Sequence, residues 1–110
     1  MNLKVKSKVW LENEVGMTVI GEGRFQILKA VRETGSISKA ATKIGQPFRR
    51  VWARLKDAEA QCGFRLVERS AGGSKLTAEA EELLKKYAEL HRTCNRYANG
   101  KFRKIFREDE

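Results

Sequence analysis

The sequence contains few of the residues from which metal, redox and catalytic sites are built. Its 110 residues include one proline, two cysteines and one histidine. Cys62 and Cys94 are far apart and belong to no CxxC pair, so the ligands of a zinc cluster and the thiols of a redox pair are both missing. No nucleophile or carboxylate pair accompanies His91. We therefore expect reduced thiols, no metal, no cofactor and no enzyme activity.

Long apolar runs are also missing. A membrane helix needs about 20 consecutive apolar residues. Residues 1–12 alternate lysine with apolar side chains, where a signal peptide would carry an uninterrupted apolar block. The sequence thus predicts a cytoplasmic protein with no membrane partner. It also predicts one domain, because the chain is too short for two ordinary ones.

Positive charge, in contrast, is abundant. The chain has 23 lysines and arginines against 14 acidic residues, which gives a formal net charge of +9. Such an excess favours an anionic partner. Nucleic acid is a stronger candidate than an acidic membrane surface or an acidic protein.

The first third of the chain changes from strand periodicity to helix periodicity. Residues 3–11 alternate apolar side chains with lysines, which predicts a half-buried edge strand. A turn and the short apolar stretch 17–20 then complete an N-terminal β-hairpin. Apolar residues recur at helical spacing from residue 24 until Thr34 and Gly35, so a first helix is predicted over 24–34.

A short second helix follows at once. Its apolar residues predict a helix over 37–44. Either Ser36 or Ser38 can cap its start, and Gly45 is placed to close it in the left-handed conformation.

The single proline marks the start of a third helix. Proline disfavours the helical region for the residue before it, so Gln46 must turn. Pro47 itself suits the first position of a helix, predicted over 47–61, where its missing N–H costs nothing. On a helical wheel the side expected to pack comprises Phe48, Val51, Trp52, Leu55, Ala58 and Glu59. The other side comprises Arg49, Arg50, Ala53, Lys56 and Asp57, with Arg54 at the border.

This helix pair matches the helix-turn-helix pattern, in which a short turn containing glycine joins two helices. Residues 34–56 include no acidic side chain and six basic ones: Lys39, Lys43, Arg49, Arg50, Arg54 and Lys56. A solvated face normally mixes the two signs of charge. The asymmetry therefore favours nucleic-acid binding.

Residues 65–77 read as a second hairpin. Two short apolar segments flank a loop over 71–74, and Arg69 and Lys75 stand on either side of its tip. Such a stretch is a simple connector in many proteins. Directly after a helix-turn-helix, a basic wing is the better interpretation.

A long helix is predicted over 78–98. Thr77 caps it, and acidic residues in its first turns suit the helix dipole. Its apolar stripe is longer than the core of so small a domain needs, so we interpret it as a dimerisation helix rather than only a cover for the core. Asn99 and Gly100 would end it, and residues 99–110 would form an unassigned charged tail.

Together these elements predict a mainly α protein with a small β component. The fold is a winged helix-turn-helix over residues 1–98, with an N-terminal β-hairpin, a wing hairpin and a long C-terminal helix.

The order of elements resembles the N-terminal DNA-binding domain of the molybdate-responsive regulators, the ModE family, whose domains look related to those of LysR-type regulators. The resemblance covers about residues 3–95. It depends on "GSIS" with "KAA", on the Arg-x-x-Trp of residues 49–52, on "VER", and on Gly-Gly ahead of Leu-Thr.

The resemblance implies roles for particular residues. The recognition helix would be 47–60, with Arg49 and Arg50 toward the major groove, and residues 69–75 would form the wing. It also implies a homodimer joined through the N-terminal helix and strand region, which competes with the last helix as the dimer seam.

Two departures from the family limit what is carried over. The family commonly has Ser-Tyr where this chain has Pro47-Phe48, so a base preference cannot be transferred. The family's wing is also longer in glycine, and its molybdate-binding domain follows the DNA-binding domain, whereas these residues contain none. We expect no molybdate binding.

The sequence therefore predicts a homodimeric, sequence-specific regulator of transcription that binds double-stranded DNA. Arg49 and Arg50 would read base edges. The residues expected to contact DNA are Ser36, Ser38, Lys39, Lys43, Gln46, Pro47, Arg49, Arg50, Ala53, Arg54, Arg69, Ser74 and Lys75. The alternative is a winged-helix interaction module or accessory subunit whose basic face meets an acidic protein and has no specific DNA site. Salt-dependent binding with a preference for one duplex would separate the two.

Overall fold

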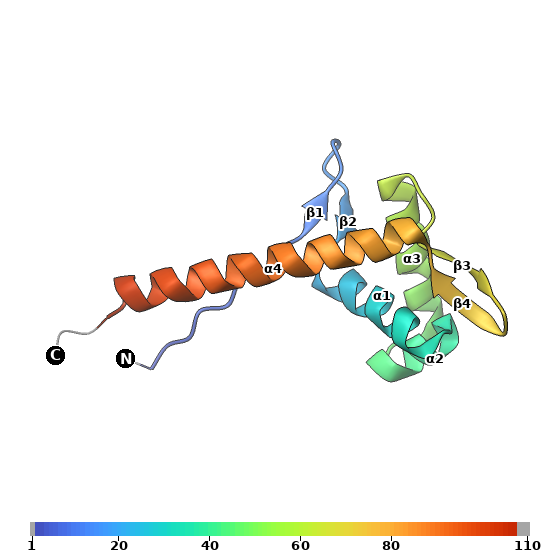
Figure 1. The fold of residues 1–110 in the computed structure, drawn as a ribbon, viewed down its shortest axis with the longest axis horizontal. Helices are drawn as coiled ribbons and strands as arrows, with labels where there is room; N and C mark the ends of the chain where they lie inside the picture. The colour runs from blue at the N-terminus through green and yellow to red at the C-terminus, as the bar shows by residue number, and fades with distance from the viewer. Residues whose placement is uncertain (1, 108–110) are drawn as a thin grey trace.

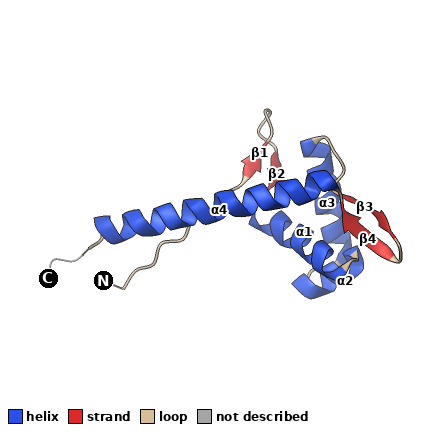
Figure 2. Ribbon diagram, viewed as in Figure 1, coloured by secondary structure: helices blue, strands red, loops and turns tan. Residues whose placement is uncertain are grey.

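A computed structural model describes residues 2–107 of the chain (Figure 1). The helices are α1 (Glu22–Thr34), α2 (Ile37–Ile44), α3 (Phe48–Cys62) and α4 (Ala78–Ile105). The strands are β1 (Leu11–Glu12), β2 (Thr18–Ile20), β3 (Val67–Ser70) and β4 (Gly73–Leu76). They form two separate antiparallel hairpins, β1–β2 and β3–β4 (Figure 2). The predicted fold class is confirmed.

A single core holds the first three helices together with the start of α4. Its buried apolar residues all lie between Ile20 and Tyr87. They come from helical stripes such as Ile27, Leu28 and Val31 of α1, and from Leu66 at the start of the second hairpin. We call residues 11–87 the head. Beyond Tyr87, α4 extends away from the other elements, and residues 2–10 run beside it (Figure 1). We call residues 88–105 together with 2–10 the arm.

The N-terminal stretch is not the strand that its alternation predicts. Only Leu11 and Glu12 pair with β2, and the register shifts between them. Residues before them leave the hairpin and lie along α4, where the Ser7 hydroxyl bonds to Asn95 and the Tyr87 hydroxyl donates to the Val9 carbonyl over 2.7 Å. The alternation of half-buried and exposed side chains is present, but it comes from packing one side of an extended segment on a helix.

Several predicted helix ends also differ from the structure. α1 begins at Glu22 rather than at residue 24, and α3 ends at Cys62 rather than at residue 61. Pro47 is the residue before α3, with ψ at 141°, rather than its first helical residue. α4 continues through Asn99 and Gly100 to Ile105, so residues 99–105 are helix and not a separate tail. The side-chain amide of Asn99 donates to the Asn95 backbone carbonyl over 2.9 Å, one turn earlier in the helix. The rest of the predicted tail includes residues 108–110, which lie outside the described residues.

None of the helices in residues 2–107 is both long enough and apolar enough to cross a membrane.

Candidate nucleic-acid interface

The turn between α2 and α3 is built from backbone contacts. Ser36 caps α2, and its hydroxyl accepts the Lys39 amide over 3.2 Å. Gly45 ends the helix at a φ of 70°, a left-handed conformation that favours glycine. The Gln46 amide donates to the Ala41 carbonyl over 3.0 Å. These contacts set the direction in which α3 leaves the turn.

The start of α3 carries exposed arginines. Arg49 and Arg50 are exposed, and neither makes an ion pair or a side-chain hydrogen bond with any residue of 2–107. Ala53 is exposed one turn after Arg49, so the residue four positions after this arginine adds little bulk to the exposed face of the helix. This part of α3 can therefore approach a polyanion closely.

Only part of the α3 side that the wheel assigned to the core is buried. Val51, Leu55 and Ala58 are buried, but Phe48 is 48 % exposed and Trp52 is 43 % exposed. The expectation that these two aromatic residues pack in the core is wrong. Phe48 and Trp52 lie about a quarter turn around the helix from the buried stripe of Val51, Leu55 and Ala58. They line an open groove between α3 and the second hairpin.

The second hairpin, residues 67–76, lies beside α3 as a wing. Its turn is Ala71-Gly72, since Ser70 pairs with Gly73. The predicted loop over 71–74 is therefore too long. Gly73 and Ser74 belong to β4, and the Ser74 amide donates to the Gly35 carbonyl over 2.9 Å.

The wing meets the turn between α1 and α2 at very short range. A Cβ atom added at Gly73 would lie 2.1 Å from the Gly35 carbonyl oxygen. No side chain fits there, so glycine at 73 is a steric requirement of the contact. The contact holds the base of the wing against the helix-turn-helix.

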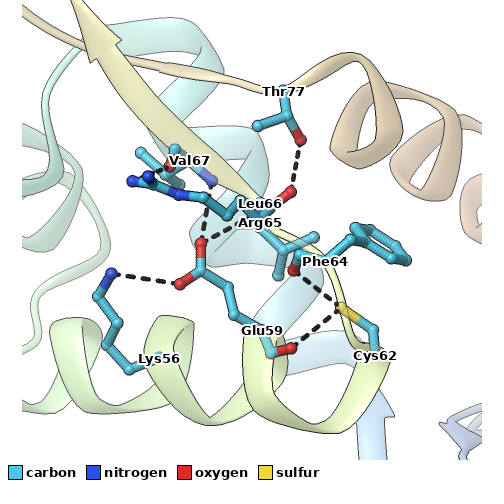
Figure 3. A network of polar contacts seen from close by, with 8 residues as sticks. All are labelled: Lys56, Glu59, Cys62, Phe64, Arg65, Leu66, Val67 and Thr77. Atoms are coloured by element: carbon cyan, nitrogen blue, oxygen red, sulfur yellow. Dashed lines mark hydrogen bonds and ion pairs between the residues drawn. The ribbon is translucent and has the colours of Figure 1, made fainter.

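A carboxylate also joins α3 to the wing, as Figure 3 shows. One oxygen of Glu59 accepts the amides of Leu66 and Val67 over 2.8 and 3.3 Å, and its other oxygen pairs with Lys56 over 3.2 Å. Burial alone would raise the pKa of Glu59, but the two amides and the Lys56 ammonium group outweigh it, so the pKa is lowered from its usual 4.5. α3 and β3 are thereby fixed relative to each other.

The same region fixes the start of α4. The Thr77 hydroxyl donates to the Arg65 carbonyl over 2.7 Å (Figure 3). The same hydroxyl accepts the Ala80 amide over 3.1 Å. Thr77 is thus both the cap of α4 and a link to the strand that begins the wing.

The opposite side of α3 is attached to α1. The Arg24 guanidinium group pairs with Asp57 over 2.5 Å and donates to the Thr18 carbonyl over 2.8 Å. Its hydrogen bond lowers the pKa of Asp57, with a smaller contribution from Gln61. Arg54 lies against Gly23 on this side and is half-buried, so it is less available than Arg49 to an external partner.

The other predicted contact residues fall into two groups. Ser38, Lys39, Pro47 and Arg69 are exposed. Lys43 and Lys75 are exposed but paired with Glu33 and Glu68, over 3.3 and 3.8 Å. Such surface pairs contribute about 0–1 kcal/mol, so a phosphate can replace the carboxylate at small cost.

One predicted contact residue points inward. The side-chain oxygen of Gln46 is buried and has no hydrogen-bond partner among residues 2–107.

Between α3 and the wing lies an open groove of about 590 Å³. Phe48, Trp52 and Lys56 line it from α3, and Ser36, Arg69 and Ser74 line it from the other side. The structure therefore brings the start of α2, the start of α3 and the wing to one surface. The sequence reasoning missed the contribution of Phe48, Trp52 and Lys56 to this groove. The Arg-x-x-Trp spacing was the available signal, since it puts Trp52 beside the basic residues.

Comparison with known proteins gives a consistent result. The sequence pattern described as "Bacterial regulatory helix-turn-helix protein, lysR family" matches residues 23–81, which is more than half of the chain. The chain is 36 % identical over 73 residues to the molybdenum transport protein ModE of Herbaspirillum seropedicae, and 40 % identical over 67 residues to the HTH-type transcriptional regulator YofA of Bacillus subtilis (strain 168). The matches cover 62 % and 61 % of this chain, but 27 % and 23 % of the relatives. The chain thus spans about a quarter of their length.

Solved structures share the fold at lower identity. The DNA-binding domain of CbnR in a complex with DNA superposes with a TM-score of 0.61 at 24 % identity, covering 72 % of this chain and 91 % of that one. The DNA-binding domain of BenM with benA site 1 DNA superposes with a TM-score of 0.63 at 21 % identity, covering 78 % of this chain and 97 % of that one.

Proposed function

The chain belongs to the LysR family of bacterial regulatory helix-turn-helix proteins, and we propose that it binds specific double-stranded DNA sites through α3 and the wing. The family match makes it a DNA-binding domain of a transcription regulator of LysR type and does not single out the molybdate-responsive regulators. The ModE-like character suggested by "GSIS" and Arg-x-x-Trp remains part of this proposal, supported by the 36 % identity to one such protein.

The observation that carries the proposal is the pair of arginines at the start of α3. Arg49 and Arg50 are exposed and lack a carboxylate partner within residues 2–107, while Lys43 and Lys75 nearby have one. An α-helix fits the major groove of B-DNA, and a guanidinium group can bond to both the O6 and N7 atoms of guanine. Lys39, Lys43, Arg69 and Lys75 would bind phosphates on either side.

The test separates base reading from phosphate binding. A duplex selected by the protein and a random duplex are compared by fluorescence anisotropy at three salt concentrations. Arg49→Ala or Arg50→Ala should cost about 1–3 kcal/mol on the selected duplex and much less on the random one, because a bidentate base contact is lost. Lys75→Ala should weaken both equally and flatten the salt slope by about one unit. Arg92→Ala, an exposed arginine of the arm, is the matched control.

Two outcomes would contradict the proposal. Equal losses on both duplexes would make the arginines phosphate clamps, and sequence reading would then lie in the wing or in DNA shape. Binding with no preference for any duplex would favour the alternative, an interaction module with no specific DNA site.

We also propose that the active form is a homodimer. Residues 5–10 lie along one side of α4, where they line an open groove together with His91, Asn95 and Ala98, and the Ser7 hydroxyl bonds to Asn95. A second stripe at spacings of seven and eight residues remains uncovered: Leu90 is 40 %, Tyr97 is 67 % and Ile105 is 72 % exposed. Apolar residues in such a row are typical of a helix that packs against another helix.

Of the two dimer seams suggested by the sequence, this exposed stripe favours the last helix over the N-terminal helix and strand region. Two copies would offer two half-sites roughly 34 Å apart on a pseudo-palindromic operator. Sedimentation showing only monomer at tens of micromolar, both free and on DNA, would contradict the proposed homodimer.

The absence of molybdate binding stays a prediction.

A further inference from the structure

The groove between α3 and the wing contains an aromatic pair that the arginine-based account does not use. Phe48 and Trp52 are one helical turn apart, with ring centroids 6.2 Å apart and planes inclined by 19°. Single exposed apolar residues are normal on a protein surface. Here two large rings form one continuous apolar surface directly beside Arg49, on the part of the molecule proposed to face DNA.

The pair is held in place from the wing. Lys56 pairs with Glu59, which accepts the amides of Leu66 and Val67 at the start of the wing. The Lys56 ammonium group also lies 4.6 Å from the centre of the Trp52 ring. A cation over an aromatic face is attracted by the ring quadrupole. Trp52 then stacks on Phe48. Side chains ordered in this way before binding lose less conformational freedom when they meet a partner.

The major groove offers one apolar group on the edges of its bases, the C5-methyl of thymine. Resting on the function proposed above, we propose that Phe48 contacts the C5-methyl group of a thymine in the operator, and that Trp52 positions the Phe48 ring for this contact. The arginines and the aromatic pair then contact different bases of the operator. Arg49 and Arg50 select guanine, and Phe48 selects a thymine near it.

Alternative occupants of the groove predict different behaviour. An apolar segment of a partner protein would not depend on the methyl group of any base. A base stacked on Trp52 would be held by its ring face, which every base has, and would not distinguish thymine from uracil.

The experiment removes the methyl group alone. Each thymine of the selected duplex is replaced singly by deoxyuridine, which pairs in the same way and lacks only the C5-methyl group. With the wild-type chain, at least one position should lose about fourfold in affinity, the equivalent of one buried methyl-sized group. Phe48→Ala should bind the thymine duplex several-fold more weakly than wild type and should show no further loss with uracil at that position.

Further variants test the contact made by Phe48 and the positioning of its ring by Trp52. Phe48→Leu keeps an apolar contact and should retain sensitivity to uracil, which also provides a readout if Phe48→Ala folds poorly. Trp52→Ala should reduce the sensitivity without moving it to another base pair. Val15→Ala, which truncates an 81 % exposed apolar side chain at the tip of the first hairpin, should behave as wild type.

The failures of the two proposals can be told apart. A wild-type chain with no preference between selected and random duplexes would overturn the proposed function and this inference with it. A chain that keeps its preference but tolerates uracil at every thymine would overturn this inference alone. Full sensitivity to uracil in Phe48→Ala would do the same, because another side chain would then contact the methyl group.

Discussion

The head and the arm of this molecule are stabilised in different ways. Every fully buried apolar side chain in the described chain lies in the head, between Ile20 and Tyr87. The arm contains Leu90, Tyr97 and Ile105 in exposed positions and depends on the contacts of α4 with residues 2–10. An isolated helix is marginal in water, and most helical stability comes from packing of an apolar face. The difference favours the proposal that a second copy packs on the exposed stripe of the arm.

The largest expected effect compares two leucines of α4. Leu84 is 2 % exposed in the head, and Leu90 is 40 % exposed in the arm. Leu84→Ala should lower the free energy of unfolding by about 2–5 kcal/mol, because it leaves a cavity in the core. Leu90→Ala should lower it by less than about 1 kcal/mol in dilute solution. Urea unfolding followed by circular dichroism measures both values.

Protein concentration sharpens this first comparison. If a second copy covers Leu90, the effect of Leu90→Ala should grow with concentration, since association stabilises the folded state by mass action. The effect of Leu84→Ala should be the same at every concentration. Equal losses for the two variants in dilute solution would show that the arm is already packed in the monomer.

The next effect compares two glycines and should have opposite signs in the two regions. Gly73→Ala would place a Cβ atom 2.1 Å from the Gly35 oxygen in the head, so the backbones must separate, at a cost of about 1–3 kcal/mol. Gly100 lies inside α4 with no atom near its Cβ position. Gly100→Ala should therefore stabilise the helix by up to about 1 kcal/mol. Thermal melting of the two variants against wild type gives the signs.

DNA affinity provides a second readout for this pair. Because the contact at Gly73 attaches the wing to the helix-turn-helix, Gly73→Ala should also weaken DNA binding, whereas Gly100→Ala should not. An unchanged melting temperature for Gly73→Ala would mean that the wing is not held as closely as the structure shows.

The sequence predicted the fold class from local signals. Helical spacing, the Ser36 cap and the left-handed glycines act over a few residues, so a pattern can show them. The exposed face of α3 with Arg49 and Arg50 followed from the same wheel. The wheel gave no signal for the exposure of Phe48 and Trp52, because it separates apolar from polar residues and does not show which apolar residues have neighbours. Only the Arg-x-x-Trp spacing, which puts Trp52 beside the basic residues, pointed to it.

The remaining errors arose where the partner is distant along the chain. Residues 3–11 alternate as a strand does, but their partner is α4, more than eighty residues later, as the contact of Ser7 with Asn95 shows. Glu59 was placed on the packing side of α3, yet its role depends on the amides of Leu66 and Val67, which no spacing rule reveals. Prediction from sequence therefore succeeded for the four helices and the wing, apart from some of their ends. It failed for the N-terminal strand and for contacts between residues distant along the chain.

The smallest expected effect compares two glutamates as a function of pH. Glu59 in the head accepts two amides, and its pKa is lowered from 4.5. Glu89 of the arm is exposed and makes no ion pair with a described residue. At neutral pH, Glu59→Gln should cost about 1 kcal/mol of unfolding free energy, because charge-assisted hydrogen bonds are lost. Glu89→Gln should cost nothing measurable.

The sign of the pH dependence follows from the direction of the shift. A carboxyl group whose pKa is lower in the folded state than in the unfolded state stabilises the fold above the unfolded value, and this contribution disappears as pH falls through the folded value. The difference between wild type and Glu59→Gln should therefore be constant near neutral pH, and should shrink below pH 4.5 as both chains come to carry a neutral side chain at this position. Urea unfolding at steps from neutral pH down to about pH 3 follows this difference. If the difference in unfolding free energy between wild type and Glu59→Gln grew as the pH fell, the carboxylate would be destabilised in the fold. Burial of Glu59 would then outweigh its contacts with the amides of Leu66 and Val67 and with Lys56.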